Sequence, residues 1–496
     1  MPLLDRPAAA VAALAYLAVV LAIGAWAARR TRTSRDFFIA GQGIGLWVTG
    51  LATTSAAFSG FVFLGGPGLT YRIGTSSFLI IASTGFTAAM LCWVVGRPLR
   101  EMAGEAEIYT VPDAVLARYG SRAASGLAAV AVVVGTVGYL GAQLLALGIL
   151  VETVFGTREL LGAWSLPAAM AAGLAVVLAY AVAGGMLAGV WTDLFQGALM
   201  VGAAVAVFAY AMAAGGGLGG IARTIASSPE LGPDFLDPLA GVPLATALGF
   251  FFVFAVGTLG QPHMLHKFYM LDDPRKLRWL PLVIGGSQSL CLLIWVGVGL
   301  AVPALVAAGR MAPLANPDDA APAFLLGFVP AGLAGLVFAG VLAAIMSTAD
   351  SFVNVGSAAL VRDLPRALGR PVGDELRAGR WATVVLGVAA ALLAWLYGDL
   401  VALLGTFAFG TFAAALAPAL AVGLNWPRAT PRAAAASIAV GLVANLGLEL
   451  LARATPLPGG ALPSAVALAA SFTVLFAASW LGGGRDRPPR PFTAGR

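Results

Sequence analysis

Long apolar runs separated by short polar segments dominate the chain, and they do not alternate apolar and polar residues as a half-exposed strand does. A bilayer admits only helices or closed barrels, and a spanning helix needs roughly 20 apolar residues. The pattern therefore predicts an all-α polytopic membrane protein with about thirteen spans. The expected spans are 8–28, 43–69, 74–96, 123–151, 160–183, 186–214, 242–266, 279–309, 323–361, 379–397, 399–425, 433–452 and 462–482.

The distribution of basic residues predicts the orientation of these spans. With the N-terminus outside, 23 of the 29 Lys and Arg residues fall in inner loops, Lys267 among them, and six fall in outer loops. Inner loops of membrane proteins carry such an excess, so the expected topology is N-out and C-in. We expect one transmembrane domain over residues 1–482 and a short basic cytoplasmic tail at 483–496.

Composition and motifs narrow the classes of function that the chain can have. The chain is 60% apolar and only 10% charged, whereas soluble domains are roughly a quarter charged. No basic face interleaved with aromatics points to nucleic acid, and no GxSxG, HExxH or Cys–His pair points to an enzyme. Cys92 and Cys291 lie inside apolar runs, where packing is the expected role. The abundance of Arg, Ala and Gly suggests a bacterium with a GC-rich genome, hence the bacterial inner membrane.

Two spans contain residues that weaken a helix. The first break covers Thr53–Gly60, with Pro67 shortly after it, and the second covers Gly257–His263. Either break alone is also explained by helix packing, because Gly and Pro are common in membrane helices. With the first span set aside, however, the breaks fall in spans one and six of ten, as in an inverted repeat with a midplane site. We therefore expect a LeuT-like 5+5 repeat over about 43–425, with one extra N-terminal and two extra C-terminal helices.

A stripe of small and hydroxyl residues follows in the second half of the chain. Ala344, Ser347, Thr348 and Ser351 are spaced to share one helix face inside an apolar run. Hydroxyls and unpaired carbonyls can hold a hard monovalent cation without a net charge. The alternative is helix packing, with the hydroxyls bonded back to carbonyls four residues earlier.

Over residues 30 to 430 the sequence resembles the sodium:solute symporter family, which includes sodium–glucose, sodium–proline, pantothenate and monocarboxylate carriers. Four stretches together carry this resemblance: Arg35–Gly41, Ser59–Gly60, Gly184–Asp193 and Ala343–Ser351. A fifth stretch, Gly260–His263, is most similar to the proline-carrier branch.

The resemblance implies a set of sodium ligands. The family's common site would use the carbonyls of Ser55 and Phe58, the carbonyl of Ala344, and the hydroxyls of Ser347 and Thr348. A possible second sodium site would use three further residues: Asp193, Asp350 and Ser351. An ion-paired structural role for either of these carboxylates is the alternative.

The same analogy places a solute between the two breaks. It would pack against Thr53, Thr54, Ala57 and Ser59, opposite Phe254, Thr258 and Gln261. Ala57 stands where proline-type members carry an acidic residue, which weakens a transfer of the proline assignment. The expected solute is an amino acid such as proline or a small carboxylate. His263 and His266, without Cys or Glu nearby, make a poor metal site.

The expected function is a sodium-coupled secondary active symporter that imports a small organic solute by alternating access, with Na⁺ as coupling ion. Proton coupling, a channel, and a transporter-like sensor working with a separate signalling partner are the alternatives. The expected partners are the solute, sodium and the lipid bilayer. No nucleic acid and no obligate protein partner are expected.

Overall fold

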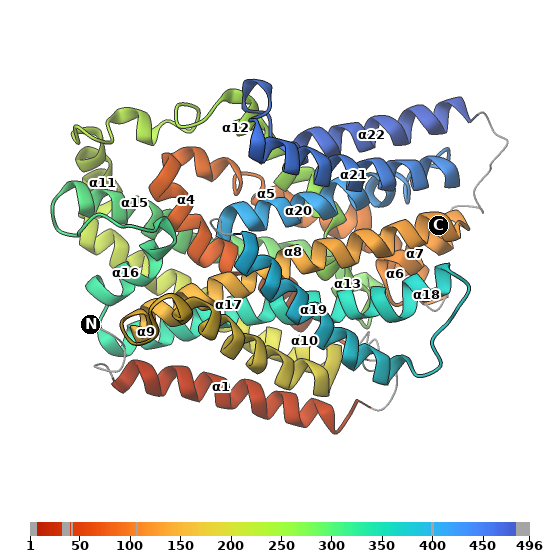
Figure 1. Ribbon diagram of the computed structural model, residues 1–496, viewed down its shortest axis with the longest axis horizontal. Coiled ribbons are helices and arrows are strands. Elements are labelled where there is room, and N and C mark those ends of the chain that lie inside the picture. The colour runs from red at the N-terminus through yellow and green to blue at the C-terminus, as the bar shows by residue number, and fades with distance from the viewer. Residues whose placement is uncertain (1–6, 32–39, 41–42, 106–107, 398–400, 483–496) are drawn as a thin grey trace.

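The structure is a computed structural model that describes residues 7–31, 40, 43–105, 108–397 and 401–482. The described residues form helices joined by short connections, together with one isolated bridge between Ile44 and Leu271. The long helices run roughly along one axis (Figure 1). The predicted all-α fold is therefore confirmed. The motif at 35–41, apart from Ala40, and the predicted tail at 483–496 lie outside the described residues.

The first half of the chain forms the helices up to α11. Their bounds are α1 Pro7–Ala28, α3 Leu46–Ala57, η3 Phe61–Gly65, α4 Gly66–Ile73, η4 Gly74–Leu79, α5 Thr84–Met90, η5 Leu91–Gly96, α6 Arg97–Glu105, α7 Val111–Tyr119, α8 Arg122–Phe155, α9 Thr157–Leu161, η6 Gly162–Trp164, α10 Ser165–Gly215 and α11 Gly217–Ala226.

The second half forms the remaining helices. Their bounds are η7 Pro233–Leu236, α12 Leu244–Val256, η8 Gly257–Gly260, α13 Pro262–Tyr269, η9 Pro274–Arg278, α14 Leu280–Cys291, α15 Leu293–Ala307, η10 Pro317–Asp319, α16 Ala320–Phe328, α17 Ala331–Ala358, η11 Ala359–Asp363, α18 Leu364–Ala367, α19 Glu375–Tyr397, α20 Val401–Ala417, η12 Pro418–Val422, α21 Pro431–Ala454, η13 Pro458–Gly460 and α22 Pro463–Leu481.

Ten helical segments within the described residues are long and apolar enough to cross a membrane, and the bent pair Leu46–Ala57 and Phe61–Leu79 raises the count to eleven. Two of these segments, Thr157–Ala179 and Met186–Gly215, share the 51-residue α10. The helix α1 is a further apolar helix of 22 residues.

The connection between the expected spans 186–214 and 242–266 contains the helix α11, on which Ile221 and Ile225 share one face and are buried. The expected span 323–361 is interrupted at Val329, where extended backbone precedes Pro330 and separates α16 from α17. Proline disfavours helical backbone at the residue before it, which explains this interruption.

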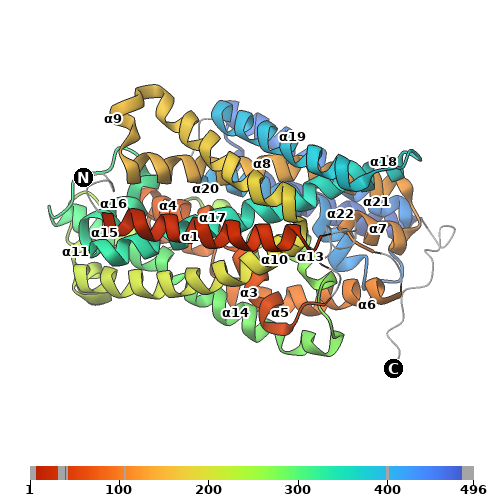
Figure 2. The ribbon, with the colours of Figure 1, turned by 90° about the horizontal axis from the view of Figure 1, so that it is seen from below.

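The helices form an inner group with flanking helices on opposite sides. The spanning segments of α8 and α20 are 78% and 89% buried, whereas those of α21 and α22 are 33% buried. Figure 1 shows α1 along the lower edge of the bundle and the α21–α22 pair at the upper edge, and Figure 2, seen from below, shows α1 in front of the other helices. The broken helices, α8, α17 and α20 therefore lie where a site can be closed off from lipid.

Candidate ion and solute site

The first predicted break is present between α3 and η3. The α-helix ends at Ala57, Phe58 adopts extended backbone with φ −103° and ψ 112°, and the two helical parts meet at 55°. The N–H of Gly60 donates to Gln143 Oε1 at 3.0 Å. An uninterrupted helix would direct that N–H to the carbonyl of Ala56, four residues earlier. The break therefore leaves this carbonyl available to another donor or to an ion.

The hydroxyl stripe of α17 faces this break. Ser347 Oγ donates to the carbonyl of Ser55 at 2.9 Å and is 3.1 Å from that of Ala344. Thr348 Oγ1 lies 3.1 Å from the carbonyl of Ala56, 3.4 Å from that of Ser55 and 3.1 Å from that of Ala344. Ser55, Ser347 and Thr348 are fully buried. Three carbonyl and two hydroxyl oxygens thus gather where the unwound helix meets α17.

This oxygen group has the chemistry of a sodium site. Unwound carbonyls in broken transporter helices coordinate sodium, and the group carries no charge that would need another partner. Four of the five expected ligand residues come together: Ser55, Ala344, Ser347 and Thr348. Phe58 lies at the break, with its N–H bonded to the carbonyl of Thr54 and its side chain on a cavity. The sequence interpretation missed the carbonyl of Ala56.

The second predicted break joins α12 to α13 through the 3₁₀ turn η8. Thr258 Oγ1 donates to the carbonyl of Phe254 at 2.5 Å. Gln261 Nε2 donates to the carbonyls of Gly257 and Phe409, each at 3.1 Å, so its amide ties the break to α20. A Cβ at Gly260 would lie 2.6 Å from the backbone nitrogen of Ala417, which explains why glycine occupies this close approach.

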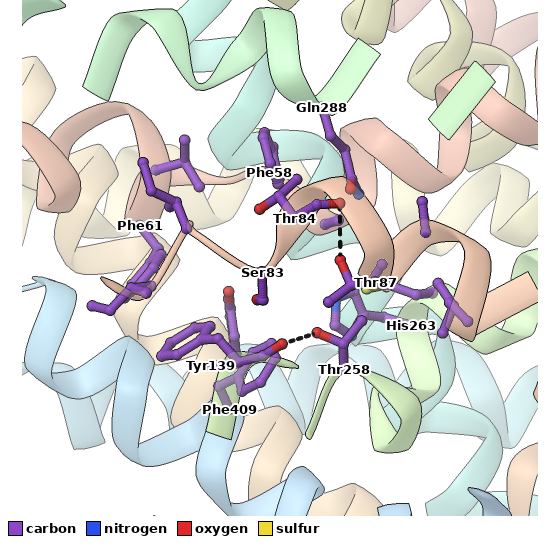
Figure 3. A pocket seen from close by; sticks show the side chains of 18 residues that line it. Phe58, Phe61, Ser83, Thr84, Thr87, Tyr139, Thr258, His263, Gln288 and Phe409 are labelled. Carbon is purple, nitrogen blue, oxygen red and sulfur yellow. Dashed lines mark hydrogen bonds between the residues drawn. The ribbon is translucent and has the colours of Figure 1, made fainter. Parts of the chain in front are cut away.

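A cavity lies between the two breaks, with about 60 Å³ open to the centres of water molecules. Figure 3 shows Phe61 and Phe409 on one side of it and Thr87, Thr258 and His263 on the other. The complete lining is Ala57, Phe58, Phe61, Val62, Ile80, Ile81, Ser83, Thr84, Thr87, Ala88, Leu91, Tyr139, Phe254, Thr258, His263, Met264, Gln288 and Phe409.

Three of the seven residues expected to contact a solute line this cavity: Ala57, Phe254 and Thr258. The other four are bonded elsewhere. Thr53 Oγ1 donates to the carbonyl of Thr49, Thr54 pairs with Ser287, Ser59 Oγ accepts from the N–H of Phe61, and Gln261 holds the second break as described.

Several residues that line the cavity were not predicted from the sequence. Tyr139 and Gln288 are polar residues inside otherwise apolar spans, and Thr87 lies in the segment after the first break. An isolated polar residue within a span was the available signal, since such residues carry a cost in lipid and face the bundle interior. The sequence did not indicate which of them face the same cavity.

Two groups expected to form a second sodium site are instead tied to other side chains. Asp193 Oδ2 lies 2.7 Å from Lys267 Nζ, and both side chains are fully buried. Asp350 Oδ1 accepts from Asn354 Nδ2 at 3.0 Å. The expected position of Lys267 in an inner loop is wrong: α13 continues to Tyr269, and Asp193 compensates the buried ammonium.

The sodium:solute symporter family model matches residues 37–441. The chain belongs to this family. The members of this family are sodium:solute symporters, which confirms the sodium-coupled symporter predicted from the sequence.

Individual relatives agree with the family match. The chain is 28% identical to the high-affinity proline transporter PutP of Bacillus subtilis (strain 168), covering 87% of this chain and 91% of the relative. It is 27% identical to the sodium/pantothenate symporter of Escherichia coli (strain K12), covering 88% and 91%. The structure of a substrate-bound, outward-open Na⁺-coupled sialic acid symporter superposes with a TM-score of 0.75, 18% identity, and coverage of 97% and 98%. That likeness shows the fold.

Proposed function

We propose that this family member imports a compact organic solute, an amino acid such as proline or a small carboxylate, together with sodium by alternating access. Two relatives are named for proline and pantothenate. The cavity lining combines aromatic rings with hydroxyl and amide groups, and the described lining residues include no Asp, Glu, Lys or Arg. Such a lining favours a small solute that is neutral or zwitterionic, or whose single charge is balanced by the coupling ion.

Sodium, in this proposal, binds the oxygens gathered between the first break and α17. Its ligands are the carbonyls of Ser55, Ala56 and Ala344 and the hydroxyls of Ser347 and Thr348, with the carbonyl of Phe58 as the further ligand expected from the sequence. The support is that each of the first five oxygens already lies within 3.4 Å of another. Asp193, Asp350 and Ser351 are not part of this ion site.

One observation carries the coupling between ion and solute. The carbonyl of Ala56 contacts Thr348, while the side chains of the next two residues, Ala57 and Phe58, line the cavity. An ion that fixes this carbonyl fixes the adjacent cavity wall. Binding linkage then requires that sodium and solute raise each other's affinity by the same factor. The membrane potential supplies about 2.3 kcal/mol per 100 mV for each sodium.

The proposed topology has thirteen spans, N-out and C-in, with the 5+5 repeat over about 43–425, in the bacterial inner membrane. Figure 1 supports the orientation within this proposal, because α6, α7, α13 and α18 gather toward one end of the bundle. These helices and their flanking loops contain many of the basic residues expected inside, including Arg100, Arg118 and Arg278. Rocking of one helix set against the other would open the cavity alternately to the two sides.

Uptake by proteoliposomes tests the function. We expect accumulation of radiolabelled proline, or of a labelled small carboxylate if proline is inert, under an inward sodium gradient and not under an equal potassium gradient. The double variant Ser347→Ala/Thr348→Ala should abolish this accumulation. Thr473→Ala is the matched control, because its hydroxyl only bonds back to Ala469 on exposed α22.

Equal uptake with sodium and potassium would contradict sodium coupling. Unchanged accumulation in the double variant would contradict the ion site but leave the symporter assignment standing. Solute binding without flux would favour the sensor.

A further inference from the structure

A buried ion pair lies beside the proposed ion site. Lys267 Nζ, in the last turn of α13, is 2.7 Å from Asp193 Oδ2 on α10, and the two side chains are 1% and 0% exposed. The same ammonium is 3.9 Å from Met186 Sδ. The pair thus joins the second half of one broken helix to α10 in the bundle interior.

A second carboxylate faces the same part of α10. A Cβ built at Gly189, one helical turn before Asp193, would collide with Asp350 Oδ2. Asp350 Oδ1 accepts from Asn354, but Asp350 Oδ2, Asp193 Oδ1 and Ser351 Oγ are buried without a hydrogen-bond partner among the described residues. Two carboxylates and a hydroxyl are oxygen ligands suited to a hard cation.

We propose that the ammonium of Lys267 is the resident cation of this second group, so that the carrier binds one sodium rather than two. The inference rests on the proposed function, because it fixes the number of sodium ions that the symporter uses. Lys267 lies on α13, the same helix whose His263 and Met264 line the solute cavity, so this internal cation is part of the broken helix and not of a peripheral loop.

Charge supports this assignment. A carboxylate in the membrane interior needs a compensating cation, and an ammonium carries the same single charge as sodium. With Lys267 Nζ at 2.7 Å, that requirement is met at Asp193 from within the chain, and a sodium ion at the same oxygen would meet a like charge. Removing the lysine leaves Asp193, Asp350 and Ser351 without the ammonium group as a cation.

Equilibrium binding of radiolabelled sodium to the purified full-length protein tests this proposal without knowledge of the solute. Wild type should bind one sodium per chain, and Lys267→Ala should bind two. Lys267→Arg, which keeps the cation, should bind one. The double variant Asp193→Asn/Lys267→Ala, which also removes the paired carboxylate, should return to one.

The matched control is Lys276→Ala. Lys276 Nζ lies 2.6 Å from Asp272 Oδ2, but both side chains are more than one-third exposed. Its removal should leave one sodium bound, because water compensates an exposed carboxylate.

Two results would overturn the proposal: two sodium ions bound by wild type, or one bound by folded Lys267→Ala. Sodium binding that is absent from wild type would instead overturn the proposed function itself. If Lys267→Ala does not fold, the wild-type stoichiometry and the double variant still decide: two ions in wild type, or two in the double variant, contradict the resident cation.

Discussion

At the scale of single residues, the proposed ion site depends on the hydroxyl groups of Ser347 and Thr348. A single substitution that replaces a hydroxyl by a methyl group removes one of its oxygens. Thr348 Oγ1 lies within 3.4 Å of the carbonyls of Ser55, Ala56 and Ala344, more backbone oxygens than Ser347 Oγ approaches. It is therefore the side chain whose oxygen is most central to the group.

Replacing Thr348 by valine keeps its shape and removes only this oxygen. A hydrogen bond or ligand contact to a charged group contributes about 1.5–3 kcal/mol. We therefore expect sodium affinity to fall roughly ten- to a hundredfold in Thr348→Val. Thr348→Ser, which keeps the hydroxyl, should stay near wild type in the same sodium titration. An equal loss in both variants would show that packing, not the oxygen, is responsible.

At the scale of helices, the peripheral helix α1 extends the site beyond the predicted repeat. Tyr16 is 3% exposed, its hydroxyl accepts from Gln196 Nε2 on α10 at 2.7 Å, and it lies 3.7 Å from Met346 Sδ on α17. Met346 directly precedes Ser347. A helix outside the repeat therefore buttresses the hydroxyl face that is proposed to hold sodium.

Tyr16→Phe should weaken sodium binding roughly two- to tenfold, because it removes the neutral hydrogen bond from Gln196, which contributes about 0.5–1.5 kcal/mol, together with the weak contact to Met346 Sδ. The expression level and the fold should be unchanged. Tyr210→Phe is a suitable control, since Tyr210 lies 14 residues after Gln196, about 21 Å along α10. Sodium titrations of wild type, Tyr16→Phe and Tyr210→Phe measure the three affinities. Equal affinities would exclude a positioning role for α1.

At the scale of helices, local sequence patterns predicted the broken and hydroxyl-bearing segments but not the contacts between distant helices. The Ser59–Gly60 break and the stripe through Ser347 and Thr348 are local patterns, and the described structure contains both. The bond from Gly60 to Gln143 and the Asp193–Lys267 pair join residues more than 70 positions apart. Those contacts depend on how the helices pack, which periodicity does not encode, so Lys267 was misplaced in a loop.

At the scale of the whole molecule, a buried charge cluster links helices near one end of the bundle. Arg362 is 3% exposed, its Nε lies 3.3 Å from Asp113 on α7, and its Nη1 lies 3.6 Å from Glu375 on α19. Its guanidinium also lies 3.9 Å from the ring centroid of Tyr109. The cluster joins α7, the end of α17 through η11, and α19 into one unit.

Arg362→Gln should therefore destabilise the protein, because it removes the buried cation beside Asp113 and leaves Glu375 with its pair to Arg366 alone. Breaking a buried pair costs about 3–5 kcal/mol, and we expect the free energy of unfolding to fall by about 3 kcal/mol. Arg97→Gln is the control: its partner Glu101 is on the same helix, the Arg97 side chain is 59% exposed, and the change should stay within about 1 kcal/mol. Denaturant titrations that give equal losses would contradict the proposed bracing role.

In the proposed mechanism, one sodium ion is held between the unwound end of α3 and the hydroxyls of α17 and organises the solute cavity beside it. An experimental structure of the protein prepared once in sodium and once in potassium tests this proposal most directly. We predict an ion bounded by the carbonyls of Ser55 and Ala56 and the hydroxyl of Thr348 in sodium, and none there in potassium. An ion bound elsewhere in sodium, with this position unoccupied, would contradict the account.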